Sequence, residues 1–453
     1  MTVGIVVSRA DSASVRIGEQ LRERADWERD DEGGSSGGPE HIARYVADGF
    51  ELLAFDPWHL ELDGVAAAFE DLDFLVFASR HAGETGPLLT AHFTGNFGAA
   101  EHGGSDRALA AACPNAHHAV VRALDEHTPE GYDAGMECTH HGPTAVGAPS
   151  MFVELGSSEA EWADDVGAAA VADAILDLRG VVPQTERTVV AFGGGHYVPR
   201  PTRIVAETDW AVGHVAADWC LDDLGDPREG RDVIERVFAA SGATRAVVDG
   251  EKPRLREVLD DLGYDVVSET WLRETTGVAL DLVADLEAAV ASVDDGLRFG
   301  ERAREATADA EYILVDHPDD LWADAHSVDS DAALAATSAN AFAYTTEENG
   351  NRVAGEIALP DADAYDAYVD ALAALLGEKY DTVAREDGTI RITDTAFDPA
   401  AAADRGVPEG PKYGRLANGE AVAVDGETVA PADVSRERTE IYALADPSEG
   451  KGN

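Results

Sequence analysis

Histidine stands beside glycine, proline, serine or threonine in several short stretches of the sequence. These stretches are S-R-H at 79–81, H-F-T-G-N at 92–96, E-C-T-H-H-G-P-T at 137–144, G-G-G-H-Y at 193–197 and G-H at 213–214. They lie at the ends of predicted strands, where α/β folds place their ligand crevices. We therefore expect them to contribute side chains to one functional site.

The histidines of these stretches suggest a metal centre. Neutral imidazole is the commonest zinc ligand in proteins, and a catalytic zinc site needs about three protein ligands. His140 and His141 cannot both point the same way from an extended segment, so we expect one to bind metal and its neighbour to anchor the loop or contact substrate. Glu137 is a candidate base or supporting carboxylate. The pool of candidate ligands is His81, His92, His140, His141, His196 and His214. Taken singly, each is more often a packed or surface residue.

Other reactive side chains have weaker support. Thr94 and Thr144 are candidate nucleophiles, but neither has an adjacent base, and a hydroxyl near glycine usually makes a turn hydrogen bond. The predicted catalytic residues are Glu137, His140, His141 and Thr144. Cys138 precedes His140 by two residues and is either a metal ligand or a small buried apolar group.

The glycine triplet Gly193, Gly194 and Gly195 follows an apolar strand and has two interpretations. Glycines let a phosphate or nucleotide backbone approach the main chain, or they merely allow a sharp turn. Arginines and an aromatic ring just downstream favour a polyanion, because they suit a phosphodiester and a stacked base. The predicted substrate-binding residues are Arg80, Thr94, Asn96, Gly193, Gly194, Gly195, Tyr197, Arg200 and Arg203.

Six further histidines lie in helical or acidic contexts, so we predict that they are on the surface: His102, His117, His118, His127, His317 and His326. The cysteines are Cys113, Cys138 and Cys220, an odd number without C-x-x-C spacing. This pattern argues against a disulfide framework and a four-cysteine zinc site. We expect reduced thiols.

The charge balance is extreme. The 453 residues contain 34 basic and 88 acidic side chains, a net charge of −54, and only four lysines. Self-repulsion of this size is screened in molar salt, where the Debye length shrinks to about 3 Å. A halophilic cytosol is therefore predicted, with an ordinary acidic protein as the alternative. The N-terminus lacks the pattern of a signal peptide, and no apolar run reaches the ~20 residues that span a bilayer. We expect a cytoplasmic protein without membrane contact.

Apolar runs that alternate with helical patterns up to about residue 290 predict an α/β fold with a mixed, mostly parallel sheet and flanking helices. Predicted strands cover 3–7, 74–78, 151–155, 188–192 and 246–248. The clearest predicted helix covers 158–178, where Ser158 and Glu161 form a capping-box pattern. Residues 30–39, rich in glycine, serine and acid, are predicted to be a flexible loop.

The pattern changes after residue 290. Residues 295–400 predict a smaller α+β domain, with a helix at 362–376 and a hairpin that turns at Asp387-Gly388. Residues 401–453 are predicted to be a C-terminal arm containing glycine and proline. The sequence has no P-loop, no G-x-S-x-G and no H-E-x-x-H.

The order of these motifs, together with G-S-S-x-x-x-W ending at Trp162 and F-G-G-G-H-Y-x-P-R, resembles the archaeal and plant D-aminoacyl-tRNA deacylases over residues 1–290. The resemblance implies hydrolysis of the ester between a D-amino acid and tRNA, zinc as cofactor, tRNA as partner and a fold like phosphorylases and peptidyl-tRNA hydrolases. We expect a monomer. The sequence departs from the family pattern at Cys138, where a small apolar residue is expected, in the long loop at 30–39 and in the extension after 295.

Residues 410–420 also resemble a short segment of tRNA 3′-processing ribonucleases of the metallo-β-lactamase class. This segment carries Lys412 and Arg415, although a structural turn is the favoured interpretation. Two rival functions remain from the sequence. One is a nucleoside phosphorylase or zinc peptidase that acts on a small substrate, and the other is a tRNA-binding protein without catalysis.

Overall fold

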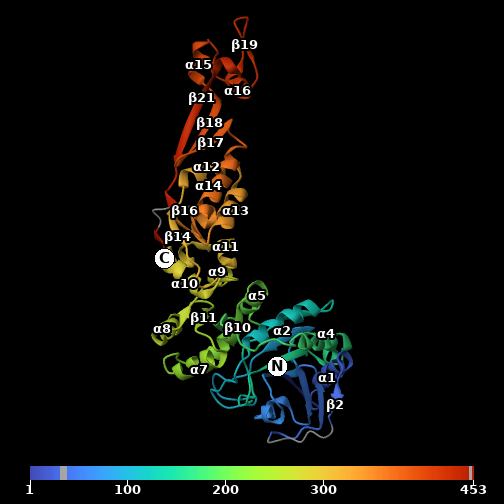
Figure 1. Ribbon diagram of the computed structural model, residues 1–453. Coiled ribbons are helices and arrows are strands. Elements are labelled where there is room, and N and C mark those ends of the chain that lie inside the picture. Colours follow the sequence, from blue (N-terminus) through green and yellow to red (C-terminus); the bar gives the residue numbers. More distant parts are fainter. Residues whose placement is uncertain (31–37, 448–450, 453) are drawn as a thin grey trace. The chain divides into compact units, whose positions relative to one another are not determined.

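The computed structural model describes residues 1–30, 38–447 and 451–452. Contacts divide the chain into two compact units, residues 1–273 and residues 274–453 (Figure 1). Most of the loop predicted at 30–39 lies outside the described residues. No helix in the described part of the chain is long and apolar enough to cross a membrane.

The first unit is built on a large mixed sheet. Within the described residues this sheet has eight strands in the order β2-β3-β4-β1-β5-β8-β6-β7. The central strands β4, β1, β5 and β8 run parallel to one another, whereas β6 is antiparallel to β8. The bounds are β1 Val3–Ser8, β2 Glu28–Arg29, β3 Ala43–Ala47, β4 Phe50–Phe55, β5 Phe74–Arg80, β6 Leu88–His92, β7 Asp133–Met136 and β8 Ser150–Gly156.

Both faces of the central strands are covered. Successive side chains of a strand point to opposite faces, so neighbouring residues pack against different elements. Val7 faces Gly18 of α1, and α1 packs on α4, which packs on α2 (Figure 1). Val6 faces the other way, into a cluster with Val65 and Phe77 beneath two short 3-10 helices. The bounds are α1 Ser12–Arg24, α2 Pro114–His127, α4 Asp165–Leu176, η1 His59–Glu61 and η2 Val65–Ala68.

A second sheet in this unit is parallel throughout, in the order β10-β9-β11-β12. Its strands are β9 Thr188–Phe192, β10 Ala211–Ala216, β11 Arg245–Val248 and β12 Asp265–Val266. Its helices are α5 Pro199–Glu207, α6 Asp218–Leu224, α7 Arg231–Ser241 and α8 Pro253–Leu262, followed by α9 Glu269–Thr275. The predicted α/β class with a mixed, mostly parallel sheet is confirmed, and each predicted strand forms.

The prediction of a single helix over 158–178 is wrong, because two helices occupy this range. Helix α3 covers Glu159–Trp162, and α4 begins at Asp165. Asp164 has extended backbone angles and its carboxylate accepts the Val166 N–H, so it starts a new helix. The capping box of Ser158 and Glu161 is present as predicted.

The second unit combines small antiparallel sheets with helices. Its largest sheet has the order β13-β15-β16-β14-β22, and β17-β18-β21 and β19-β20 form two further sheets. The strands are β13 Leu297–Phe299, β14 Ile313–Asp316, β15 Ala343–Glu347, β16 Arg352–Leu359, β17 Thr382–Glu386, β18 Thr389–Phe397, β19 Val422–Val424, β20 Glu427–Val429, β21 Ser435–Ala443 and β22 Lys451–Gly452. The helices are α10 Leu280–Ala289, α11 Glu301–Glu305, α12 Asp319–Val328, α13 Ser330–Asn340, α14 Ala362–Leu376, α15 Pro399–Asp404 and α16 Pro411–Ala417, with short 3-10 helices at Val293–Asp295, Glu348–Gly350 and Pro431–Val434.

Two predictions for the second unit are confirmed. Helix α14 has the predicted bounds, and β17 and β18 form a hairpin in which Gly388 adopts a φ of +70°. The segment after residue 400 is joined to this hairpin, because β21 pairs with β18 from Thr389↔Ala443 to Phe397↔Ser435.

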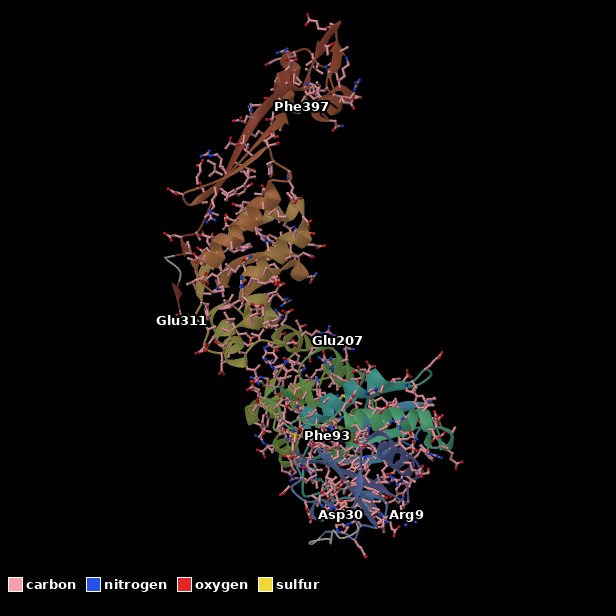
Figure 2. The ribbon with its side chains drawn as sticks, turned by 45° about the vertical axis from the view of Figure 1, so that its right-hand side comes forward. Arg9, Asp30, Phe93, Glu207, Glu311 and Phe397 are labelled. Carbon is pink, nitrogen blue, oxygen red and sulfur yellow. The ribbon has the colours of Figure 1, made fainter. Side chains whose placement is uncertain are left out.

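The cations at 410–420 serve the local fold. Lys412 Nζ donates to the Ala423 carbonyl at 2.6 Å, and Arg415 Nε donates to Glu420 at 2.9 Å. Leu416 is buried in a small cluster against which Phe397, labelled in Figure 2, packs. These contacts support the structural interpretation of this segment over a nucleic-acid contact.

Two of the six histidines predicted on the surface are instead buried. His117 is fully buried on α2, against the ring of Phe93 at 4.5 Å between centroids. His317 contacts the hydroxyl of Tyr368 through Nε2 and the carboxylate of Asp319 through Nδ1, both at 2.7 Å. Their sequence contexts are helical or acidic, but these side chains face the cores.

Replacing Ile175 by alanine tests the packing of α4. Ile175 is fully buried, so its truncation should lower the free energy of unfolding by about 2–5 kcal/mol. Val166→Ala on the same helix is the matched control, because Val166 is 59% exposed and its truncation should change stability by less than about 0.5 kcal/mol. Denaturant midpoints in molar KCl measure both values. Equal effects of the two variants would contradict this packing.

His117 should make stability sensitive to acid. Burial lowers its pKa to about 3, although the backbone of Ala91 opposes the shift. Below about pH 6.5 His117 is protonated in the unfolded chain but stays neutral in the folded one, so stability is lost as the pH falls. In His117→Leu the free energy of unfolding should therefore depend less steeply on pH, by about 1.4 kcal/mol per pH unit between roughly pH 6 and 4. His102→Leu, at an exposed histidine, should keep the wild-type slope. Denaturation curves at stepped pH measure the slopes, and an unchanged slope in His117→Leu would refute the assignment.

Candidate active site

The segment that begins at Glu137 joins the two sheets of the first unit. Its N–H groups at Glu137 and His140 donate to the carbonyls of Ala91 and Phe93, beside β6. Between them, Cys138 N–H donates to the His196 carbonyl and Thr139 N–H to Val215 of β10. Phe93, which accepts the His140 N–H at this junction, is labelled in Figure 2. The junction brings the predicted stretches together.

Three histidines meet at the junction. His92 is the last residue of β6, and its ring centroid lies 4.2 Å from His140 and 4.9 Å from His141. One nitrogen from each ring falls within 4.8 Å of the others, so the three form a group that could hold a metal ion. The ring of Phe152 packs against both His92 and His141, at 5.3 and 5.0 Å between centroids.

Main-chain carbonyls orient all three rings. The Nδ1 atom of His92 lies 3.0 Å from the Phe93 oxygen, and those of His140 and His141 lie 2.8 and 2.7 Å from the oxygens of Cys138 and Gly142. A carbonyl only accepts, so Nδ1 carries the proton and Nε2 keeps a lone pair. His92 Nε2 is buried without a hydrogen-bond partner in the described part of the chain.

The expectation that His140 and His141 point apart is wrong. Both belong to the same group of rings, because His141 has a φ of +43° and the segment is not extended there. Few residues with a Cβ adopt this left-handed conformation, and such residues often lie at functional sites.

Two buried carboxylates adjoin the histidines. Glu137 Oε2 lies 2.7 Å from His196 Nε2 and 3.8 Å from His140 Nε2, and its Oε1 lies 3.2 Å from His81 Nδ1. Burial alone would raise the pKa of Glu137, but hydrogen bonds from His196 and His81 hold it well below its usual value. Glu154, 3.6 Å from His92, has its pKa raised by burial. The pKa values of the two carboxylates are thus shifted in opposite directions.

His196 lies between two acidic groups. Its Nδ1 is 3.5 Å from Cys138 Sγ, and its Nε2 contacts Glu137. The contact with Cys138, followed by that with Glu137, raises the pKa of His196 to about 10, which makes the ring a cation at neutral pH. Hydrogen bonds from Cys220 and His196 lower the pKa of Cys138 to about 6. Cys138 is fully buried, so it can orient His196 but not reach an ester.

Several predicted residues hold the surrounding loops. His214 has both ring nitrogens engaged, Nδ1 with Thr139 Oγ1 at 3.0 Å and Nε2 with the Ala110 carbonyl at 2.9 Å. Thr94 Oγ1 donates to the Pro143 carbonyl, and Asn96 Nδ2 donates to the carbonyls of Gly103 and Ser105. Thr144 Oγ1 accepts the Ser105 N–H at 2.9 Å. The side chains of Thr94, Asn96, Thr144 and His214 therefore bond to loop atoms and do not belong to the group of three histidines.

The glycine triplet forms a turn next to β11. Gly193 has a φ of +99°, and a Cβ there would lie 2.5 Å from the Asp249 carbonyl. Downstream, Arg203 pairs with Glu269 at 2.7 Å, and Arg200 pairs with the same carboxylate at 3.3 Å. Both arginines are therefore engaged by protein carboxylates. Tyr197 is 39% exposed, and its hydroxyl lies 3.3 Å from His81 Nε2.

Two residues of the site were not identified from the sequence. Glu154 stands within the apolar strand β8, and a charged residue in such a run is the signal that could have identified it. Trp219 is 42% exposed and stacks on His196 at 6.3 Å between centroids, but nothing in the sequence marks it. Trp219 also lines a cavity of about 660 Å³ together with His140, His141 and Phe97.

Comparisons with known proteins agree on one family. A family model described as D-aminoacyl-tRNA deacylase matches residues 68–267. The D-aminoacyl-tRNA deacylase of Halobacterium salinarum is 56% identical over 100% of both chains. That of Natronomonas pharaonis is 54% identical over 96% of this chain and 98% of its own, and that of Methanoregula boonei is 34% identical over 96% of each.

One solved structure is also similar. A crystal structure of a conserved protein of unknown function is 27% identical and has a TM-score of 0.55. The match covers 61% of this chain and 98% of that chain.

Proposed function

The chain belongs to the D-aminoacyl-tRNA deacylase family, so its activity is hydrolysis of the ester bond of D-aminoacyl-tRNA, and we propose that the cluster around His92 is where this happens. One observation carries the proposal. Three imidazoles converge with each Nδ1 bonded to a main-chain carbonyl, which leaves three Nε2 atoms available. His92 is buried, whereas His140 and His141 are half-buried, so the group can be reached from outside.

We propose that zinc binds to His92, His140 and His141. The donor set fits, because imidazoles whose other nitrogen is bonded to a carbonyl are typical zinc ligands in their neutral form. Burial lowers the pKa values of His140 and His141, and a bound cation would displace the proton that Glu154 favours on His92. The buried Nε2 of His92, which lacks a hydrogen-bond partner among the described residues, is explained by such an ion. Zinc in such a site supplies a water of lowered pKa and a Lewis acid for the ester carbonyl.

Protein groups would handle the protons. Glu137 is ionised and lies 3.8 Å from His140, so it is placed to accept the proton of the attacking water. As the water oxygen bonds to the ester carbon, the bond to the ribose oxygen breaks and that oxygen needs a proton. His196 is a cation with a side chain 32% exposed, and we assign it as the donor.

Two cavities suggest how the substrate lies, one lined in part by the cluster and one reached from it through Tyr197, which contacts His81. The 660 Å³ cavity is lined by His140, Phe97 and Trp219, and we assign it to the amino-acid side chain. Gly95 and Gly98 line the same cavity, so part of its wall is main chain without a side chain. A second cavity of about 510 Å³ is lined by Tyr197, Thr85 and Arg203 and would take the terminal nucleoside.

The charge of the chain fits the relatives' habitat. Two of the similar proteins come from Halobacterium and Natronomonas, and the net charge of −54 suits molar salt. We propose that the protein works in a salt-rich cytoplasm with tRNA as its partner and zinc as its cofactor.

The activity should be specific for chirality. D and L substrates carry the same groups, so fixed sterics at the glycine-lined wall must exclude the L form. In molar KCl we expect D-tyrosyl-tRNA to be hydrolysed at least about tenfold faster than L-tyrosyl-tRNA, with broad tolerance of D side chains. Release of the amino acid measures both rates. Equal rates would refute this assignment, and tRNA binding without hydrolysis in excess zinc would support a non-catalytic protein.

The zinc ligands can be tested one at a time. Because ligation needs each Nε2, His92→Ala, His140→Ala and His141→Ala should each lose bound zinc and hydrolysis together. Chelation of the wild type should abolish activity, and added zinc should restore it. Metal analysis and D-tyrosyl-tRNA hydrolysis measure the outcome.

His214→Gln is the matched control, because both ring nitrogens of His214 already contact protein groups and zinc should stay bound. His196→Gln should keep zinc and slow only turnover. If all three ligand variants fold and retain both zinc and full activity, the metal site is wrong.

A further inference from the structure

Arg80 is held between two tryptophan rings at the end of β5. Its guanidinium carbon lies 4.5 Å from the ring centroid of Trp58 and 4.5 Å from that of Trp162. Trp58 follows β4 in the chain, and Trp162 belongs to α3. Aromatic rings contact a guanidinium through its face, so the edge, where the N–H donors point, stays available to a ligand. We call Arg80, Trp58 and Trp162 the arginine clamp.

Among the residues that the structure describes, the charge of Arg80 has no ion-pair partner. Most arginines of the first unit are engaged by carboxylates, as Arg200 and Arg203 are by Glu269. In the part of the chain that the structure describes, the Arg80 guanidinium forms neither an ion pair nor a hydrogen bond. Burial raises the pKa of the Asp11 carboxylate, and the charge of Arg80 opposes this rise. That carboxylate accepts main-chain N–H groups, including the N–H of Arg80 itself. Arg245 also lies over two tryptophan rings, those of Trp210 and Trp271 at 5.9 and 5.3 Å, but it stands at the start of β11, whereas Arg80 stands at the end of β5 beside His81.

The clamp is attached to the catalytic cluster. Trp162 Nε1 donates to the carbonyl of His81 at 2.9 Å, and His81 follows Arg80 directly. The His81 ring in turn contacts Glu137 and Tyr197. The clamp also lies where the parallel strands β1, β4, β5 and β8 end, and α/β folds bind ligands at such edges.

We propose that the arginine clamp binds a backbone phosphate of the tRNA 3′ end. The inference rests on the proposed function, which supplies an RNA substrate. A phosphate offers the guanidinium edge two oxygens in the matching geometry, and lysine lacks this planar fork. The aminoacyl group carries an ammonium, so the phosphodiester is the part of the substrate that this cation can attract. One directional contact places the ester at the cluster although the protein surface repels nucleic acid.

Binding of two small probes separates this role from a structural one. Cytidylyl-adenosine contains one phosphodiester, and adenosine contains none. Calorimetric titration of the full-length protein in molar KCl should show the dinucleotide binding about tenfold more tightly than adenosine. Arg80→Gln should remove this difference and leave adenosine binding unchanged. Arg80→Lys keeps the charge and should retain only part of the difference.

Kinetics provide the second readout. For D-tyrosyl-tRNA, Arg80→Gln should raise KM about tenfold with kcat within about twofold of the wild type, because the phosphate contact exists in both ground and transition states. Arg179→Gln is the matched control. Arg179 also lies over an aromatic ring, that of Phe50 at 5.4 Å, but pairs with Asp48.

The outcomes are distinguishable. If Arg80→Gln binds the dinucleotide as the wild type does, or lowers kcat with KM unchanged, the clamp does not bind phosphate. Equal affinity of the wild type for both probes would also overturn the proposal. If the wild type prefers the dinucleotide but does not hydrolyse D-tyrosyl-tRNA, the proposed function fails and the clamp stands. If Arg80→Gln does not fold, Arg80→Lys and Trp58→Leu test the proposal instead. Trp58→Leu weakens the stacking on Arg80 and should also raise KM.

Discussion

The hydrogen bonds of one short segment determine the geometry of the site. Residues 137–140 donate main-chain N–H groups to β6 on one side and to β10 and the glycine turn on the other. A buried main-chain donor must be paired, so this segment cannot shift without leaving several groups unsatisfied. The left-handed conformation of His141 is held in place by this network. The Nδ1 atom of each of the three rings thus bonds to a main-chain carbonyl, which fixes the orientation of the ring.

The same rigidity concentrates ionisable groups where water is scarce. Glu137 and Glu154 are nearly fully buried, and five histidines lie close to them. In such a medium each carboxylate either gains a cationic partner or takes up a proton. Hydrogen bonds from His196 and His81 hold the pKa of Glu137 well below its usual value. Burial raises the pKa of Glu154, whose contact with His92 raises the pKa of that ring although burial opposes the rise. Two carboxylates whose pKa values are shifted in opposite directions therefore lie beside the same histidines, an arrangement that can separate the roles of acid and base.

Cations are scarce in this chain, and their use differs between regions. Arg200 and Arg203 resemble phosphate ligands in the sequence, but Glu269 engages both, and its pKa falls to about 2, chiefly because of Arg203. Arg80 is surrounded by indole rings instead of carboxylates. Aromatic rings can fix a guanidinium without neutralising its charge or occupying its donors. This difference, together with the bond from Trp162 to the His81 carbonyl, marks Arg80 as the cation suited to an external anion at the site.

The sequence by itself determined the elements and the pool of reactive groups. Hydrophobic periodicity located β1, β5, β8, β9 and α14, because these patterns depend only on neighbours along the chain. Motif order gave the family. The tertiary structure alone decided which histidines converge, since His92 and His140 are 48 residues apart and meet only through the hydrogen bonds of segment 137–140. It also decided that His214 holds a loop, that Glu154 joins the site, and that His141 turns toward its neighbour, because a single left-handed φ is invisible in side-chain periodicity.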